Sequence, residues 1–487
     1  MRVEIKLRCG GSDMIKGIGL ENFKAFKNLA YLDFKKINVF LGPNSSGKSS
    51  YLKGLLALKN TMTNQDSEPA LHLSERLGDF TSLVFGNRVD EKITITIRFD
   101  TNYHEPAKST PEQSSEGFKY GSAALLTILI LFTLFSKKDQ KGATDFITQK
   151  EAEFVAKELE RVEFSVFQEA PKTPNRLEVL KVFFKDGDVY EVKPYEKPHQ
   201  IFLNGKPVTH HQIVKPYKFL IQFQELNLIG SDEEDWEIIN PLAIAVSFIE
   251  QELKNLVENM IHIEPFRNEP KRSEIVTNFQ FDTVGSKGEN MLTSLIGLKN
   301  ARVEGSLENN SLQDDINRWM NEFQLAQTVE VEELGSNNFA LKIKNKKTGV
   351  TSNIVDVGAG TSQLLPIIVE SVISAPHSVL LIEEPETHIH PNAQAKLGEL
   401  FVECSQKYDK RFFIETHSMY LVMQLQIMAA KKLLKPEDVG IYYFRQDENG
   451  THVIDLKLNE NGQFDEEFPT GFFDVAYELT KTLLSHM

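Results

Sequence analysis

Short apolar segments bounded by polar turns recur in the first hundred residues of the chain. Residues 15–21, 31–34, 37–41 and 93–99 alternate apolar and polar positions or are continuously apolar, which predicts β-strands. Residues 50–61 place leucines at helical spacing and predict a helix. A short polar segment joins the third strand to this helix, so the sequence predicts a strand–loop–helix unit near the N-terminus.

The same alternation of strands and helices returns in the second half of the chain. Short, continuously apolar segments that are typical of buried strands alternate there with amphipathic helices. This order predicts an α/β fold built on a parallel sheet. The predicted elements are a hairpin over 339–344 and 352–357, helices over 361–374 and 392–404, and strands over 378–382 and 411–415.

The segment between these halves, about residues 101–260, predicts a mixed α/β insert with short strands and a helix over 240–260. Its residues 121–135 form an apolar run of fifteen residues, whereas a membrane-spanning helix needs about twenty. Two interpretations of this run stay open, namely a buried or interface helix and a segment that contacts a membrane. We favour the first and expect the insert to bind a second copy or a partner.

Composition narrows the class of protein. With 41% apolar and 25% charged residues, the chain has the balance of a folded protein and not of a disordered or collagen-like one. The net charge of −15 excludes a generally basic coat for nucleic acid. Two cysteines can form at most one disulfide bond, which cannot stabilise a fold of this length, and so low a cysteine content fits a reducing cytosol. Without an apolar stretch behind a basic N-terminus, we expect a cytoplasmic protein with no membrane span.

Local basic patches remain open despite the acidic balance. One set lies on the predicted hairpin and another lies near residue 270. Each set either binds nucleic-acid phosphates or is a solvated face, since edge strands commonly carry lysines. The residues are Lys342, Lys344, Lys346 and Lys347 in the first set, and Arg267, Lys271 and Arg272 in the second.

The strongest local motif is G-x-x-x-x-G-K-S at residues 42–49, between a predicted strand and a predicted helix. Its glycines let backbone N–H groups surround a polyphosphate, and the helix N-terminus adds partial positive charge. Lys48 would reach the β- and γ-phosphates of ATP, and the Ser49 hydroxyl would bind Mg²⁺. The predicted nucleotide-binding residues are Gly42, Pro43, Asn44, Ser45, Ser46, Gly47, Lys48, Ser49 and Ser50.

Two adjacent carboxylates follow the apolar segment at 379–382. Ligands of α/β sheets bind at the carboxyl ends of the strands, where Glu383 and Glu384 would lie. Because successive side chains of an extended segment point in different directions, Glu383 can hold Mg²⁺ through water while Glu384 acts as a base. The alternative is two surface glutamates after a core strand.

The next buried strand ends in Glu415-Thr416-His417-Ser418. A histidine at this edge can contact the γ-phosphate or orient the attacking water. His388 and His390 are near in sequence and leave a metal cluster open, but their spacing matches no standard zinc site. A fourth segment, residues 356–363, places two glycines before a helix, which alone is weak evidence of a ligand site.

The motifs in this order resemble the ABC-type ATPase head shared by structural-maintenance-of-chromosomes proteins, RecF-like recombination ATPases and OLD-family proteins. The resemblance is strongest to stand-alone bacterial AAA-family proteins of the OLD-like and RecF-like type. Three further segments support it. They are N-F-K-A-F at 22–26, P-F-R at 265–267 and F-P-T-G-F-F-D at 468–474.

This resemblance implies a role for each motif. Lys48 and Ser49 match the Walker A lysine and serine, Glu383 the Walker B acid that binds magnesium, Glu384 the catalytic glutamate and His417 the switch histidine. The signature segment, which completes the ATP site of a neighbouring protomer in such heads, is matched by Gly358, Gly360, Ser362 and Gln363. The family sequence LSGGQ is absent, and Gln65 is the candidate for the Q-loop glutamine.

The resemblance also implies the architecture and the partners. Two protomers would sandwich two ATP molecules, giving a homodimer or a higher homo-oligomer. We expect an N-terminal ATPase lobe at 14–100, the insert at 101–260, a C-terminal ATPase lobe at 261–430 and a C-terminal extension at 431–487. About 70 residues follow His417, fewer than a typical domain has, so we expect no nuclease within the chain.

Three hypotheses for the biological role follow from the resemblance. The first is an ATPase that acts as sensor or scaffold in bacterial antiviral defence and controls a separate nuclease or toxin effector. The second is a DNA-repair or recombination ATPase that clamps DNA. The third, a scaffold with vestigial ATP binding, is disfavoured by the intact Lys48, Ser49, Glu383, Glu384 and His417. Neighbouring genes would separate the first two.

Overall fold

The computed structural model describes most of the chain in several segments. The described residues are 14–100 except 67, 75, 76 and 89, then 159–195, 200–209, 214–218, 220–223, 233–277, 283–298, 312–469 and 475–485. The apolar run at 121–135, for which we favour a buried or interface helix, lies outside the described residues. Within the described part, no helix is both long and apolar enough to cross a membrane.

The described backbone divides into two compact units. One holds the residues up to Phe34 together with those from Lys53 to Glu258, and the other holds Lys35–Leu52 together with those from Asn259 onward. The division falls within helix α1 (Lys48–Thr63). The four-part division expected from the sequence stays a prediction.

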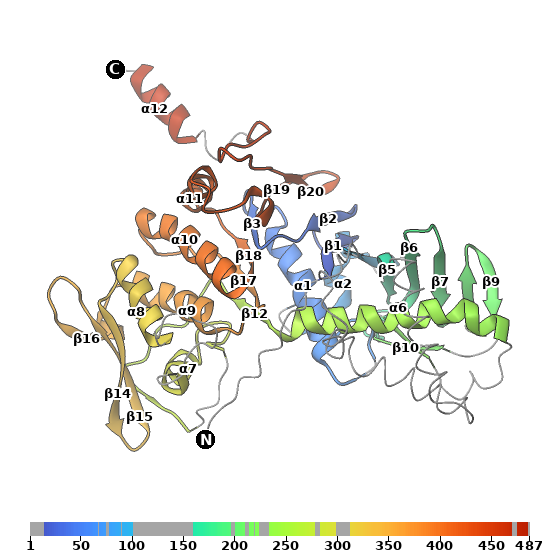
Figure 1. Ribbon diagram of the computed structural model, residues 1–487, viewed down its shortest axis with the longest axis horizontal. Coiled ribbons are helices and arrows are strands. Elements are labelled where there is room, and N and C mark those ends of the chain that lie inside the picture. The colour runs from blue at the N-terminus through green and yellow to red at the C-terminus, as the bar shows by residue number, and fades with distance from the viewer. Residues whose placement is uncertain are drawn as a thin grey trace, which may run out of the picture. The chain divides into compact units, whose positions relative to one another are not determined.

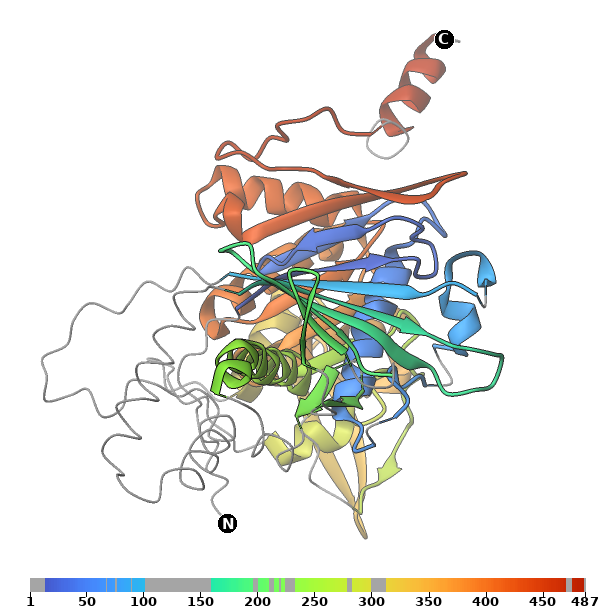
Figure 2. The same cartoon turned by 90° about the vertical axis from the view of Figure 1, so that its right-hand side faces the viewer.

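The first unit is built on an antiparallel sheet whose strands have alternately buried positions, as expected when one face packs on a core. Figure 2 shows its strands side by side in blue to green. The strands that follow residue 158 continue the sheet that β1 begins. In spatial order they are β2 (Ala30–Asp33), β1 (Ile15–Glu21), β4 (Ile93–Phe99), β5 (Leu159–Phe167), β6 (Arg176–Phe184), β7 (Val189–Lys193), β8 (Gln200–Leu203) and β9 (Lys206–Thr209).

Helix α6 (Glu233–Glu258) is the longest described helix of this unit. It buries Leu242, Ile249 and Leu253, and the rings of Phe248 and Phe99 lie 5.7 Å apart, so α6 packs beside strand β4. The remaining described elements are a hairpin of β10 (Val214–Tyr217) and β11 (Leu220–Phe223), and the short helix α2 (Phe80–Leu83).

The second unit contains the predicted parallel sheet (Figure 1). Its central strands are buried along nearly their whole length, as strands covered on both faces must be. The order is β12 (Met260–Ile263), β17 (Val379–Glu383), β18 (Arg411–Glu415), β3 (Ile37–Leu41), β19 (Val439–Asp447) and β20 (Gly450–Asp455). The first five are parallel, and β20 returns antiparallel to β19. The two last strands fall in the predicted C-terminal extension, yet they complete this sheet.

The helices of the second unit, except the C-terminal one, share one hydrophobic core with the central sheet. Side chains cap the starts of two of these helices. The Ser418 hydroxyl accepts a hydrogen bond from the Leu421 N–H, and His390 caps the helix that begins at Pro391. The helices are α7 (Met291–Leu298), α8 (Leu312–Glu322), α9 (Ala359–Ile373), α10 (Pro391–Tyr408), α11 (Met419–Ala430) and α12 (Val475–Ser485). A small antiparallel sheet contains β13 (Glu274–Ile275), β15 (Asn338–Lys344), β14 (Thr328–Gly335) and β16 (Thr351–Asn353).

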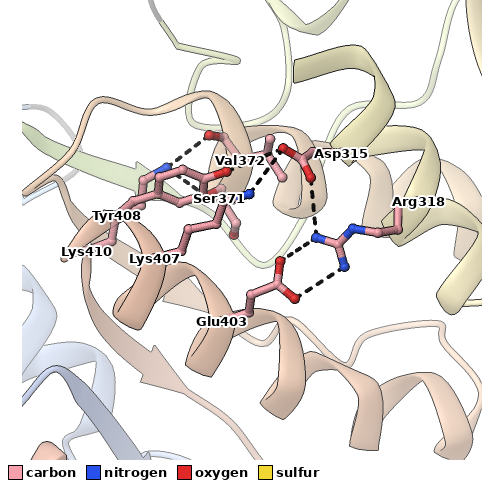
Figure 3. A network of polar contacts seen from close by, with 8 residues as sticks. All are labelled: Asp315, Arg318, Ser371, Val372, Glu403, Lys407, Tyr408 and Lys410. Atoms are coloured by element: carbon pink, nitrogen blue, oxygen red, sulfur yellow. Dashed lines mark hydrogen bonds and ion pairs between the residues drawn. The ribbon is translucent and has the colours of Figure 1, made fainter. Parts of the chain in front are cut away.

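A network of polar contacts links helices α8, α9 and α10 (Figure 3). Lys410, which is 1% exposed, donates to the carbonyls of Ser371 at 2.8 Å and Val372 at 3.1 Å. These carbonyls lie in the last turn of α9, where no intrahelical donor follows. Burial lowers the pKa of Lys410 to about 8. Arg318 of α8 forms an ion pair with Glu403 of α10. Contacts with α8 and α9 therefore hold α10 and the residues that join it to β18.

Candidate functional site

The loop after β3 has the geometry that its glycines predict. Gly42 has a φ of 140°, and a Cβ there would lie 2.3 Å from the Phe444 carbonyl oxygen, so only glycine fits. Ser45 and Gly47 also have positive φ angles, of 61° and 103°. The chain then enters α1 at Lys48, which leaves the first N–H groups of the helix directed toward the loop.

Lys48 is buried within this loop at 2% exposure. Its Nζ donates to the carbonyls of Gly42 at 2.9 Å and Pro43 at 2.8 Å. Burial lowers the pKa of Lys48, and the charges of Glu415, Glu384 and Glu386 oppose that shift. An ammonium group held between loop carbonyls and carboxylates is positioned to exchange those carbonyls for phosphate oxygens.

A carboxylate that the sequence analysis did not single out lies at the helix start. Ser49 Oγ donates to Glu415 Oε1 at 2.8 Å, and Glu415 is 5% exposed. Burial raises the pKa of Glu415 to about 7, aided by the charge of Glu383 and opposed by the Ser49 hydrogen bond. The available signal was that Glu415 closes a buried strand just as Glu383 does.

Glu383 and Glu415 end neighbouring parallel strands and are paired in register. Glu383 Oε1 lies 2.6 Å from His262 Nε2 of β12, a histidine that the sequence did not reveal as a site residue. The structure therefore brings Lys48, Ser49, Glu383 and Glu415 to the same edge of the sheet.

Glu384 leaves the strand in a left-handed conformation, with a φ of 44°. Its N–H donates to the Glu415 carbonyl at 2.8 Å, and its Oε2 accepts from the Thr387 hydroxyl at 3.3 Å. Since this conformation costs energy in a residue other than glycine, these contacts help to hold the turn at Glu384. The two adjacent carboxylates can then take different roles.

Arg267 fixes the backbone of this turn. It is 5% exposed, and its Nη2 donates to the carbonyls of Glu383 at 2.9 Å and Glu384 at 3.2 Å. Burial lowers its pKa to about 10. The interpretation of Arg267 as part of an exposed basic patch is wrong, because the guanidinium lies inside the unit.

Glu386 fixes the turn that carries the histidine. Its Oε2 accepts from the Thr416 hydroxyl at 2.7 Å and its Oε1 from the His417 N–H at 2.5 Å. Burial raises the pKa of Glu386, and these hydrogen bonds lower it. Burial, followed by the nearby charge of Lys48, lowers the pKa of His417. Both effects favour the neutral form of the His417 imidazole, which can accept or donate a proton.

The predicted signature segment begins α9. Gly358 is its N-cap, and a Cβ on Gly360 would lie 3.0 Å from the His388 carbonyl. Ser362 is 7% exposed and donates within its own helix to Ala359, while Gln363 Nε2 donates to the Arg267 carbonyl at 3.3 Å. The segment thus contacts the residues that flank the β17 turn. Gln65, the candidate Q-loop residue, is exposed after α1.

The hairpin of β19 and β20 supports the loop. The Thr451 hydroxyl of β20 donates to the Ser46 carbonyl at 2.8 Å. The loop and β19 line a pocket of about 530 Å³, bordered by Pro43, Asn44, Ser46, Tyr443, Arg445, Gln446 and Pro469. Ser46 Oγ is buried and has no hydrogen-bond partner among the described residues, so the loop retains an unused donor.

These residues fit Mg²⁺ and a nucleotide. The loop supplies a strained, glycine-dependent cradle with a buried ammonium group, and the sheet edge supplies a hydroxyl and carboxylates, the oxygen ligands that Mg²⁺ prefers. Mg²⁺ usually binds one or two carboxylates together with substrate phosphates and water. Among the described residues, no group of three or more His, Cys, Asp or Glu side chains could hold a metal, and that includes the histidines at 388, 390 and 417.

A parallel α/β sheet with this loop defines a P-loop nucleotide-binding protein. A family profile described as "AAA ATPase domain" matches residues 14–422, and a second, a domain of unknown function named DUF3696, matches residues 434–483. The chain belongs to the AAA ATPase domain family. The predicted fold class, an α/β P-loop ATPase, is confirmed.

The solved structures that the chain matches include heads of SMC proteins. The SMC head domain from Thermotoga maritima is 9% identical, with 91% of this chain and 99% of that chain covered and a TM-score of 0.35. An SMC head with an extended coiled coil, bound to the C-terminal domain of ScpA and derived from Pyrococcus furiosus, is 10% identical, with 96% and 99% covered and a TM-score of 0.38.

An SMC head bound to the C-terminal winged-helix domain of ScpA is 12% identical, with 92% of this chain and 98% of that chain covered and a TM-score of 0.41. At such identities and TM-scores, the family membership rests on the AAA ATPase profile alone. No curated protein matched the chain.

Proposed function

We propose that this protein binds ATP with Mg²⁺ and hydrolyses it slowly. The observation that carries the proposal is the buried Lys48 ammonium in a P-loop, next to a sheet edge where Ser49, Glu383 and Glu415 lie together. Lys48 would exchange the Gly42 and Pro43 carbonyls for β- and γ-phosphate oxygens. Ser49 and Glu383 would hold Mg²⁺, which neutralises phosphate charge when bound.

Glu384 would take the proton from the attacking water, since its charge acts on Lys48 and it follows Glu383 directly in the chain. The neutral His417 would orient this water or contact the γ-phosphate, with its backbone held by Glu386. Arg267 keeps the turn fixed through the carbonyls of Glu383 and Glu384.

Replacement of Glu384 tests the proposal. Glu384→Gln keeps the size of the side chain and removes the base, so turnover should fall by roughly a hundredfold or more while ATP binding is retained. Steady-state phosphate release and equilibrium nucleotide binding measure the two effects. Normal hydrolysis by Glu384→Gln would refute the role of Glu384, and a wild-type protein that neither binds nor hydrolyses ATP would refute the function.

We further propose that ATP joins two protomers, each of which offers its signature segment to the other. Support comes from the family resemblance and from the position of Gly358, which is exposed and has no atom within 4 Å of a Cβ built on it. Such an open glycine at a helix start leaves room for a ligand that another chain presents.

For the biological role, we propose an ATPase of bacterial antiviral defence that controls a separate nuclease or toxin effector, on the basis of the family resemblance. A phage-challenge assay with the native operon tests this role, because Lys48→Ala should abolish protection. Equal protection by wild type and Lys48→Ala would argue against it.

The alternative role, a repair ATPase that clamps DNA, draws on the basic residues near the small sheet. There Lys342 pairs with Glu332 at 3.0 Å and Arg272 with Asp356 at 2.6 Å. Lysine and arginine side chains that already pair with carboxylates displace fewer counterions from DNA. These ion pairs therefore weaken the case for the repair role and favour the defence role. Salt-dependent DNA binding with and without ATP would favour the repair role instead.

A further inference from the structure

Glu415 combines burial with incomplete hydrogen bonding. Its Oε1 accepts from Ser49 Oγ at 2.8 Å, whereas its Oε2 is buried and has no hydrogen-bond partner among the described residues. Leaving a buried carboxylate oxygen unpaired is costly, so folded proteins rarely keep one without a ligand or a functional reason. The unused oxygen lies at the same sheet edge as the P-loop serine.

The distance between the two side chains matches that of ligands on one ion. Mg²⁺ binds oxygens in an octahedron at about 2.0–2.1 Å, which places neighbouring ligand oxygens about 2.9 Å apart. Ser49 Oγ and Glu415 Oε1 lie 2.8 Å apart. Both atoms could therefore bind the same ion with little movement, provided that the hydroxyl turns its proton away from the carboxylate.

The other carboxylate of the edge is already engaged. Glu383 Oε1 lies 2.6 Å from His262 Nε2, and His262 is 9% exposed. Glu383 and Glu415 are register partners on parallel strands, so both side chains leave the sheet at the same level and on the same face. The ion can then contact Glu415 directly and reach Glu383 through a bound water.

We propose that Glu415 is a second carboxylate of the Mg²⁺ site and binds the ion directly beside Ser49. This inference rests on the proposed function, since the ion is the one that accompanies ATP. The proposal thus places a metal-binding residue in the segment 414–418, which also contains His417.

Metal affinity in the presence of a non-hydrolysable ATP analogue tests the proposal in the full chain. Mn²⁺ serves as the probe because its binding can be followed by electron paramagnetic resonance. Glu415→Gln should weaken Mn²⁺ binding at least tenfold, while binding of the analogue in EDTA stays within twofold of wild type. Glu332→Gln, which removes an exposed carboxylate of β14, is the matched control and should bind Mn²⁺ like wild type.

Glu415→Asp provides the second variant, because it keeps a carboxylate on the same backbone. Its Mn²⁺ affinity should fall between those of wild type and Glu415→Gln. Wild-type Mn²⁺ affinity in a folded Glu415→Gln would overturn the proposal, and so would higher affinity, which would mean that Glu415 keeps Ser49 from the metal. If wild type bound the analogue neither with nor without metal, the proposed ATPase function itself would fall.

Discussion

At the scale of single residues, the site depends on charges that the fold keeps out of water. Lys48, Glu415 and Glu386 are all perturbed mainly by burial. Each retains hydrogen bonds that limit the cost of that burial. A polar cluster of this kind tolerates the approach of a polyanion because its fixed donors replace those of water.

Lys48→Ala should weaken ATP binding most among the P-loop variants. The loss of a buried ammonium that would pair with phosphate removes charge-assisted hydrogen bonds worth about 1.5–3 kcal/mol each, or roughly 10- to 100-fold in affinity. Titration with a fluorescent ATP analogue measures the change. Lys342→Ala, which removes a surface ion pair on β15, should leave the affinity unaltered, and an equal loss in both variants would contradict the role of Lys48.

Glu370 of α9 gives a pH dependence of stability that is separate from the site. It is fully buried and accepts from the Val284 N–H at 2.6 Å, and burial raises its pKa to about 7. Because the folded-state pKa lies above the ordinary value of 4.5, the folded state binds the proton more tightly. The stability that Glu370 contributes is therefore present at low pH and is lost as pH rises toward 7.

Glu370→Gln removes this titration. Relative to wild type, the variant should gain up to about 3 kcal/mol in free energy of unfolding between about pH 5 and pH 8. Urea denaturation of both proteins at the two pH values measures the difference. Curves that shift in parallel with pH would show that Glu370 does not titrate in this range.

The residues of the P-loop could be singled out because their motif is local. Lys48 and Ser49 are recognisable because the whole P-loop is one short segment. Glu415 contacts Ser49 across 366 positions of sequence, and Glu383 contacts His262 across 121. Such contacts depend on which strands become neighbours, and no pattern within either segment encodes that.

At the scale of elements, the strands were predictable and their neighbours were not. The predicted strands at 15–21, 37–41, 93–99 and 411–415 coincide with β1, β3, β4 and β18, because their apolar patterns are short and sharply bounded. Helix α9 begins two residues before its predicted start and α10 ends four residues after its predicted end, since caps rather than apolar periodicity set helix ends. That β19 would lie against β3 could not be predicted, because parallel pairing joins distant segments.

The hairpin of β19 and β20 should contribute to nucleotide binding without touching the catalytic residues. Thr451→Val keeps the side-chain shape but removes the donor to the Ser46 carbonyl, which should lower stability by about 1–3 kcal/mol. ATP affinity should also fall, because the P-loop loses a support. Denaturation and ATP titration measure the effects, with Thr328→Val on β14 as the control for losing a more exposed hydroxyl. Unchanged ATP affinity in a destabilised Thr451→Val would limit the hairpin to a structural role.

At the scale of the whole molecule, assembly can be tested through the open glycine of the signature segment. Gly358→Arg adds a side chain that meets no atom of its own chain within 4 Å of the Cβ, so folding and ATP binding should be retained. In a two-protomer assembly, the arginine would obstruct the nucleotide of the neighbour and abolish turnover. Light scattering with ATP should then report only the 55.4 kDa protomer.

Mixing two inactive variants sharpens this test. A pair of Lys48→Ala and Gly358→Arg protomers contains one doubly defective site and one site with an intact P-loop and an intact signature segment. Partial recovery of ATPase activity on mixing is expected if the sites are shared between protomers. Continued inactivity of the mixture, with each variant folded, would contradict shared sites.

The strand β19 lies beside the P-loop strand, yet the two belong to different family profiles, one ending at residue 422 and the other beginning at residue 434. The limits of the two family profiles therefore differ from the limits of the folded sheet. A lineage that lost or exchanged the C-terminal module would leave β3 as an unpaired edge, prone to aggregation, at the point where phosphate would bind. The edge of the sheet that carries the P-loop therefore depends on both profile regions, although only one of them contains the motifs.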